Sequence, residues 1–133
     1  MFKFMLDSTI VIYIIKRRPM AVLDQFNANT GRMVISSISL AELLHGVEKS
    51  TEPLRNLRVV EDFVSRLTVL DYDDKAALHY GAIRANLERK GTPIGINDLH
   101  ISGHARSCGL ILVTNNRREF DRVDGLIVEN WLD

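Results

Sequence analysis

The chain alternates short apolar segments with longer segments of helical spacing, and this alternation is its strongest constraint on the fold. The apolar segments are rich in Val, Ile and Leu, which is typical of strands buried on both faces of a sheet. We expect strands at residues 3–6, 33–36, 68–72, 110–114 and 126–130. Strands that alternate with helices favour a parallel sheet with helices on both faces. The expected fold class is therefore α/β, with a short, mostly parallel central sheet.

The intervening segments carry the start and stop signals of helices. Pro53 suits the first turn of one helix, and apolar residues follow it at helical spacing. Asp73 is a candidate N-cap of a long helix that Gly91 ends. The segment 9–16 is rich in β-branched residues, so its assignment as a helix is ambiguous. Further helices are expected after Pro19, at 40–49, from a candidate N-cap at Asn97 to Cys108, and at 117–120.

Length and composition are those of an ordinary folded protein. The 133 residues suit a single domain, expected to span residues 1–133, and 46% apolar residues can bury a core. The 17 basic and 17 acidic residues balance, so any binding of nucleic acid must depend on local patches. No apolar run approaches the roughly 20 residues that span a bilayer. The lone cysteine, Cys108, is expected to be buried in a reducing compartment. We therefore expect a cytoplasmic protein without a membrane partner.

Four acidic residues stand near expected strand ends and helix starts. Asp7 follows the first strand, and Glu42 lies in the first turn of the helix after 33–36. Asp98 lies in the first turn of the helix after a GTPIG loop, and Glu119 follows the fourth strand. Sites in open α/β sheets form beyond the carboxyl ends of the strands. We therefore expect these four carboxylates to share one edge of the sheet.

Each acid also has a purely structural explanation. Asp7 could cap the following helix, and Ser39 and Glu42 have the spacing of a capping box. Asp98 could complement a helix dipole, and residues 116–119 form a looser capping pattern. Four caps need not converge, whereas convergent carboxylates repel one another and raise each other's pKa unless a divalent cation joins them. Oxygen ligands favour Mg²⁺ or Mn²⁺ over zinc, so metal-assisted hydrolysis without a covalent nucleophile is the expected reaction class.

Four blocks of the sequence, in order and at suitable spacing, resemble one protein family. They are FMLDSTIVIYIIKRRP, ISSISLAELLHGVEKS, GTPIGINDLHISGHARSCGLILVTNNRREF and GLIVENW. Together they cover nearly the whole chain and are similar to the VapC toxins, the PIN-domain ribonucleases of bacterial toxin–antitoxin pairs. The resemblance implies a PIN-like fold that cleaves RNA with Mg²⁺, or with Mn²⁺ as a substitute. The VapC toxins that look most similar cut transfer RNA in the anticodon loop, typically of the initiator, which inhibits translation, and other members cut ribosomal RNA.

The acidic residues of this family match the same four positions of the chain. The resemblance implies that Asp7 and Asp98 are metal ligands, and that Glu42 and Glu119 complete the catalytic pocket directly or through water. Asp121 is an alternative to Glu119, although the TNNRREF block aligns Glu119 with the family position. The implied partners are a VapB-type antitoxin, an RNA substrate, and a second copy of the chain in a homodimer that joins the antitoxin in a larger complex.

One departure from the family pattern follows Asp7. The family commonly has Asp-Thr-Asn where this chain has Asp7-Ser8-Thr9. Ser8 keeps a hydroxyl that could hold Asp7 or a bound water, whereas Thr9 lacks the amide of Asn. This change could weaken the orientation of the site. It also supports the alternative of a degenerate PIN module that binds RNA or protein without cutting.

Other polar patterns leave further alternatives. The basic clusters at 16–18 and 117–118 could contact phosphates or could be solvated surface. His100 and His104 have the spacing of two zinc ligands on a helix, but the third ligand and the Glu of such a motif are missing. A receiver-like signalling domain would need a Lys after the fourth strand, where this chain has Asn115.

Overall fold

Within residues 1–132, which the computed structural model describes, the chain forms an α/β fold around a five-stranded sheet. The strands lie in the order β3-β2-β1-β4-β5, and every neighbouring pair is parallel. They are β1 (Phe4–Leu6), β2 (Met33–Ser36), β3 (Thr68–Leu70), β4 (Ile111–Val113) and β5 (Val128–Glu129). Each lies inside a predicted strand segment, so the predicted parallel sheet is confirmed. Residue 133, the last of the expected domain, lies outside the described residues.

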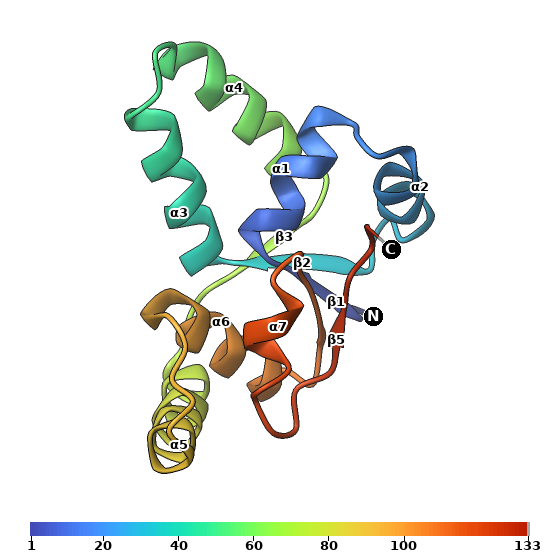
Figure 1. Ribbon diagram of the computed structural model, residues 1–133. Coiled ribbons are helices and arrows are strands. Elements are labelled where there is room, and N and C mark those ends of the chain that lie inside the picture. The colour runs from blue at the N-terminus through green and yellow to red at the C-terminus, as the bar shows by residue number, and fades with distance from the viewer. Residues whose placement is uncertain (133) are drawn as a thin grey trace.

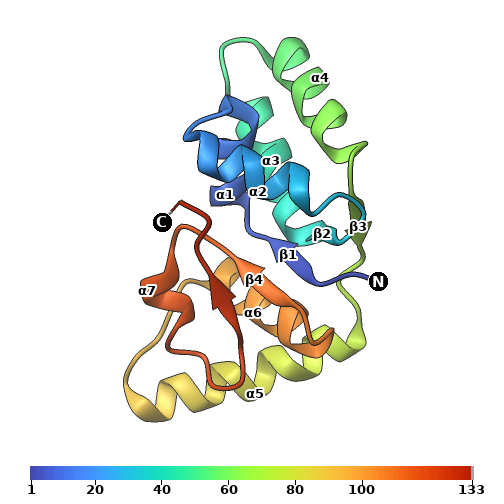
Figure 2. The ribbon, with the colours of Figure 1, turned by 90° about the vertical axis from the view of Figure 1, so that its right-hand side faces the viewer.

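Helices cover both sides of the sheet, as the alternating pattern predicted. They are α1 (Ser8–Lys16), α2 (Met20–Ala28), α3 (Ser37–Glu48), α4 (Pro53–Val64), α5 (Asp74–Lys90), α6 (Ile96–Ser107) and α7 (Arg117–Phe120). Helices α1 to α4 lie on one side, and α5 to α7 lie on the other (Figure 1, Figure 2). The ambiguous segment 9–16 is therefore helical, because packing of its apolar face overrides the β-branched composition.

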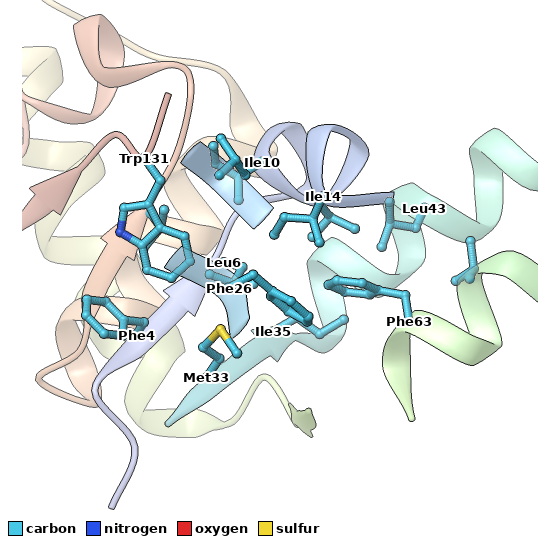
Figure 3. Packing of buried hydrophobic residues seen from close by; sticks show 14 of the residues in the cluster. Phe4, Leu6, Ile10, Ile14, Phe26, Met33, Ile35, Leu43, Phe63 and Trp131 are labelled. Carbon is cyan, nitrogen blue, oxygen red and sulfur yellow. The ribbon is translucent and has the colours of Figure 1, made fainter. Parts of the chain in front are cut away.

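The core on the α1–α4 side joins strands to helices that are far apart in the sequence. Phe4 and Leu6 of β1 both point into this core. Figure 3 shows Trp131, near the end of the chain, edge-on against Phe4 with ring centroids 5.2 Å apart. Phe26 of α2 stacks on Phe63 of α4 at 5.6 Å. These aromatic contacts fix α2 and α4 over the face of the sheet.

The core on the opposite side uses the alternate residues of the same strands. Met5, Val34 and Leu112 point to this side, where they pack against Ile101 of α6 and Phe120 of α7. Successive strand residues face opposite sides of a sheet. Because both sides are covered, β1 and β4 are apolar throughout and show no polar alternation.

The ends of the helices confirm some predicted signals and correct others. Asp73 caps α5 with its side chain, and Gly91 ends this helix in the left-handed conformation with φ of 69°. Helix α3 begins at residue 37 rather than 40, because the side chain of Ser36 caps it. Asn97 was expected to cap α6, but the cap position belongs to Gly95 and Asn97 lies inside the first turn.

Two further features concern Cys108 and the length of the helices. Cys108 is exposed, so the prediction of a buried cysteine was wrong. It occupies the C-cap of α6, where the chain leaves the helix at Gly109 with φ of 66° and turns towards β4. Among residues 1–132, no helix is long and apolar enough to cross a bilayer.

Helices α5 and α6 approach each other closely at Gly103. A Cβ at this position would lie 2.9 Å from the carbonyl oxygen of Ala76 and 2.9 Å from the backbone nitrogen of Tyr80. Both neighbours are backbone atoms, so neither can move aside by a change of side-chain rotamer. Glycine is therefore needed for α5 to pack on α6, the helix that carries Asp98.

This contact generates a pair of opposite predictions for stability. Gly103→Ala should lower the free energy of unfolding by about 1–3 kcal/mol, because the helices must move apart. Gly81→Ala is the matched control on α5, since no atom lies within 4 Å of its Cβ position. It should raise stability by about 0.5–1 kcal/mol, the helix-propensity difference. Urea denaturation of the two variants measures both changes, and a stabilising Gly103→Ala would refute the close approach.

Candidate active site

Asp7 sits at the carboxyl end of the central strand β1 and is 2% exposed. Its side chain caps α1, since the Ser8 backbone N–H donates to Oδ1 at 2.8 Å. The Thr9 and Thr114 hydroxyls donate to Oδ2 at 3.0 and 2.8 Å. Asp7 is therefore both a helix cap and a buried carboxylate held in one orientation by neutral donors.

Thr9, which replaces the usual family Asn, takes part in this arrangement. Besides donating to Asp7, its Oγ1 accepts the backbone N–H of Asn115 at 3.2 Å and lies 3.4 Å from Oγ1 of Thr114. Thr114 in turn accepts the backbone N–H of Asn116 at 2.9 Å. The two threonines thus tie the start of α1 to the loop after β4, and Thr9 orients Asp7 without an amide.

Glu42 approaches Asp7 from α3. Because α3 begins at residue 37, Glu42 lies in the second helical turn, and its predicted place in the first turn was wrong. The capping box with Ser39 was wrong for the same reason, since Ser39 is buried and its hydroxyl has no partner among the described residues. The carboxylate of Glu42 instead accepts the Ser8 hydroxyl and the Asn97 amide, both at 3.3 Å.

Asp98 and Glu119 meet across the same edge of the sheet. Asp98 lies in the first turn of α6 and Glu119 in α7, and a hydrogen bond joins their carboxyl groups. The Asn116 amide donates to Oδ2 of Asp98 at 3.3 Å and to Oε2 of Glu119 at 3.2 Å. The expected capping role of residues 116–119 was wrong, because the Asn116 side chain makes no cap bond.

The pKa values show that the four carboxylates influence one another. Burial raises the pKa of Asp7, and burial together with the charge of Asp7 raises that of Glu42. The pKa of Asp98 rises to about 8, chiefly from burial, then from its hydrogen bond with Glu119 and from the charges of the other three acids. The hydrogen bond from Asp98 lowers the pKa of Glu119. Asp98 and Glu119 therefore share one proton near neutral pH when no cation is present.

The ligand chemistry of this edge suits a hard divalent cation. Among residues 1–132, none of the four carboxylates forms an ion pair with a Lys, Arg or His nitrogen. No group of three acidic, histidine or cysteine side chains in this part of the chain is arranged to hold a metal ion by itself. Mg²⁺ does not require one, because it is usually bound by one or two carboxylates together with waters. Three carboxylates with raised pKa values, together with Glu119, can supply such ligands.

The remaining candidate residues lie apart from these four carboxylates. Asp121 pairs with Arg117 at 3.1 Å on the exposed side of α7, so it is Glu119 that contacts Asp98. His100 Nδ1 lies 2.8 Å from the Tyr72 hydroxyl, and the buried His104 Nδ1 lies 2.8 Å from Oγ of Ser36. Both imidazoles therefore serve contacts between α6 and the β2–β3 side of the sheet.

Comparison with known proteins decides the family. A model of the PIN domain family matches residues 4–126. The chain is 59% identical over 132 residues to "Ribonuclease VapC2" of Haemophilus influenzae, which covers 99% of this chain and 100% of the relative. It is 58% identical over 131 residues to "tRNA(fMet)-specific endonuclease VapC" of Salmonella typhimurium, with 98% and 99% covered. The chain belongs to the VapC-type PIN-domain ribonucleases.

Solved structures of the family have the same fold. The VapBC complex of Salmonella typhimurium bound to DNA contains a chain with a TM-score of 0.95 and 58% identity, and the match covers 98% of this chain and 99% of that one. VapBC2 of Rickettsia felis, bound to a promoter fragment, gives a TM-score of 0.92 at 40% identity, with 98% and 99% covered. The predicted PIN-like fold is therefore confirmed.

Three polar residues of this VapC-type site were missed by sequence reasoning. Thr114 holds Asp7, and Asn97 holds Glu42. Asn116 holds both Asp98 and Glu119. The sequence pattern predicts Asn97 and Asn116 as helix caps and Thr114 as the end of a buried strand. The available signal was their position at the carboxyl ends of strands and next to the acids, where polar side chains face the site.

The shared proton predicts how metal-free stability depends on pH. The pKa of Asp98 is raised from 3.8 to about 8, so the folded protein keeps a proton that the unfolded chain releases. This contribution is complete below about pH 4 and is lost as the pH rises through about 8. The lowered pKa values of Glu119, His100 and His104 act in the opposite direction.

Comparison with Asp98→Asn isolates the effect of the shared proton. As the pH rises from about 5 to about 8 in EDTA, the melting temperature of the wild type should fall relative to that of this variant. Both proteins keep His100 and His104, so the contribution of the histidines is the same in the two curves. Mg²⁺ should restore the wild type at the higher pH, because the cation replaces the proton. Parallel pH curves for the two proteins would contradict the coupling of Asp98 to the other acids.

Proposed function

We propose that this chain is the toxin of a VapB–VapC pair and that it hydrolyses phosphodiester bonds of RNA with Mg²⁺, for which Mn²⁺ is a substitute. The observation that carries the proposal is the convergence of Asp7, Glu42, Asp98 and Glu119 at one sheet edge, where no Lys, Arg or His among residues 1–132 forms an ion pair with them. Carboxylates crowded in this way are costly unless the site serves a cation.

Asp7 and Asp98 are the residues we assign to the metal. Glu42 and Glu119 complete the pocket, as further ligands or through water. A bound Mg²⁺ would supply an activated water and would stabilise negative charge on the phosphate. The chain itself supplies orientation, because neutral hydroxyl and amide groups fix each carboxylate without cancelling its charge. The N-termini of α1 and α6 at this edge add a positive potential for the phosphate.

Names of relatives support a narrower substrate and a partner. Since the Salmonella relative is named a tRNA(fMet)-specific endonuclease, we propose transfer RNA, cut in the anticodon loop of the initiator, as the substrate. Such cleavage would inhibit translation and would take place in the cytoplasm. The solved VapBC complexes support a VapB-type antitoxin as the partner. A homodimer within a larger complex remains part of the proposal.

Cleavage of purified transfer RNA by the antitoxin-free chain tests the activity. Mg²⁺ should give discrete fragments, EDTA should abolish them, and Asp98→Asn should slow cleavage by about 100-fold or more, since metal-bound charge stabilisation is worth several kcal/mol. Asp121→Asn is the matched control, because its carboxylate pairs with Arg117 outside the pocket. If folded protein cut neither transfer RNA nor ribosomal RNA, the non-cutting PIN module would replace this proposal.

Substitutions of Thr9 test whether this residue replaces the family Asn in positioning Asp7. Thr9→Val removes the hydroxyl at nearly constant shape and should lower kcat by about 10- to 100-fold, the value of a hydrogen bond to a charged group. Thr9→Ser keeps the hydroxyl and should retain most of the activity. Equal rates for wild type and Thr9→Val would show that Thr114 and Ser8 suffice to orient Asp7.

A further inference from the structure

A basic hollow lies at the C-terminal end of α1, outside the carboxylate pocket. It is lined by Tyr13, Lys16, Arg18 and Pro19, and its volume is about 750 Å³. Lys16 and Arg18 are exposed, and Tyr13 is half-buried. Arg17 adopts the left-handed conformation with φ of 58° and lines a separate cavity between α1, α2 and α4. The turn at Arg17 therefore directs its two basic neighbours into one hollow and its own side chain into another.

A chain of contacts connects the basic hollow to the carboxylate pocket. The Tyr13 hydroxyl accepts the Asn115 amide at 3.5 Å, and the backbone N–H of Asn115 donates to the Thr9 hydroxyl that holds Asp7. With a rise of about 1.5 Å per residue, Lys16 lies about 13 Å along the α1 axis from Asp7. A ligand strand bound at the carboxylates would therefore reach the hollow within a few units.

The charges of the basic hollow are free for a ligand. Among residues 1–132, neither Lys16 nor Arg18 forms an ion pair, whereas Arg117, on the other side of the loop after β4, is bound by Asp121. A pocket of four carboxylates repels a polyanion, and the chain has no net positive charge to offset this repulsion. Cations close to the pocket are then required to hold the phosphates that flank the reacting one.

We propose that the basic hollow binds the RNA strand beside the carboxylate pocket, with phosphates on Lys16 and Arg18 and a base against the ring of Tyr13. This inference depends on the proposed function, since it names the surface that holds its substrate. Cationic side chains beside a partly exposed aromatic ring are the usual elements of single-strand binding. A structural role, in which Lys16 only complements the dipole of α1, would affect stability but not RNA binding.

Fluorescence anisotropy with a labelled single-stranded oligouridylate tests the proposal in EDTA. All variants carry Asp98→Asn, so no cleavage occurs. Lys16→Ala and Arg18→Ala should each weaken binding about 3- to 5-fold, the upper range for an exposed ion pair. Each should also reduce the magnitude of the salt slope by about 0.7, the value for one lost contact with a single-strand phosphate. Tyr13→Leu should weaken binding about 5-fold or more with an unchanged slope, because stacking involves no counterion release.

Arg17→Gly is the matched control. It removes the same charge from the same turn, and glycine accepts the left-handed conformation without strain. It should bind the oligonucleotide like the parent protein. If Arg17→Gly weakened binding as much as Arg18→Ala, the effect would be diffuse electrostatics and the hollow would not be the site. Unchanged RNA binding in Lys16→Ala and Arg18→Ala, with loss of antitoxin binding instead, would also overturn the proposal.

The binding assay separates this inference from the proposed catalytic function. If the hollow variants lost RNA affinity but the wild type cut no RNA, the hollow would be supported as an RNA site and the nuclease would be rejected. Cleavage by the wild type together with normal RNA affinity of the hollow variants would support the nuclease and reject the hollow. Melting temperatures of all variants, expected within a few degrees of the parent, exclude unfolding as the cause.

Discussion

The crowding of carboxylates at one edge of a parallel sheet is the constraint on which the rest of this structure depends. In a parallel sheet all carboxyl ends lie at the same edge, and β1 stands at its centre between β2 and β4. Asp7 leaves β1 at this edge, Glu42 follows β2, and Glu119 follows β4. Asp98 joins them from the start of α6, which the close contact at Gly103 packs against α5. The topology thus creates an electrostatic cost that a divalent cation can relieve.

The residues around the carboxylates limit this cost without removing the charge. Hydroxyl donors hold Asp7, amides hold the other three acids, and no cationic side chain among residues 1–132 pairs with any of them. An Arg or Lys in these places would stabilise the protein more strongly but would compete with the cation. Neutral donors therefore orient the carboxylates and leave their negative potential available. The Asn116 amide, which bridges Asp98 and Glu119, shows this most clearly.

The basic hollow lies outside the carboxylate pocket. The basic hollow begins about four helical residues beyond Thr9, and the loop after β4 connects the two through Asn115. This separation would reconcile a chain of zero net charge with the proposed polyanionic substrate. In that proposal the pocket attracts the metal, and the neighbouring surface attracts the phosphates.

The strands, the fold class and the convergence of the four acids could be predicted from the sequence alone, because apolar periodicity and strand-end position are local features. Cores on both sides of the sheet made the strand segments mostly apolar, so they could be recognised without the structure. Only the tertiary structure decided the roles of Thr114, Asn97 and Asn116, because their partners lie on other elements. The structure also shows that Glu42 lies in the second turn of α3 and that the Thr9 hydroxyl donates to Asp7. Hydrogen bonds between residues far apart in the chain depend on how helices pack on the sheet, and no local pattern records that packing.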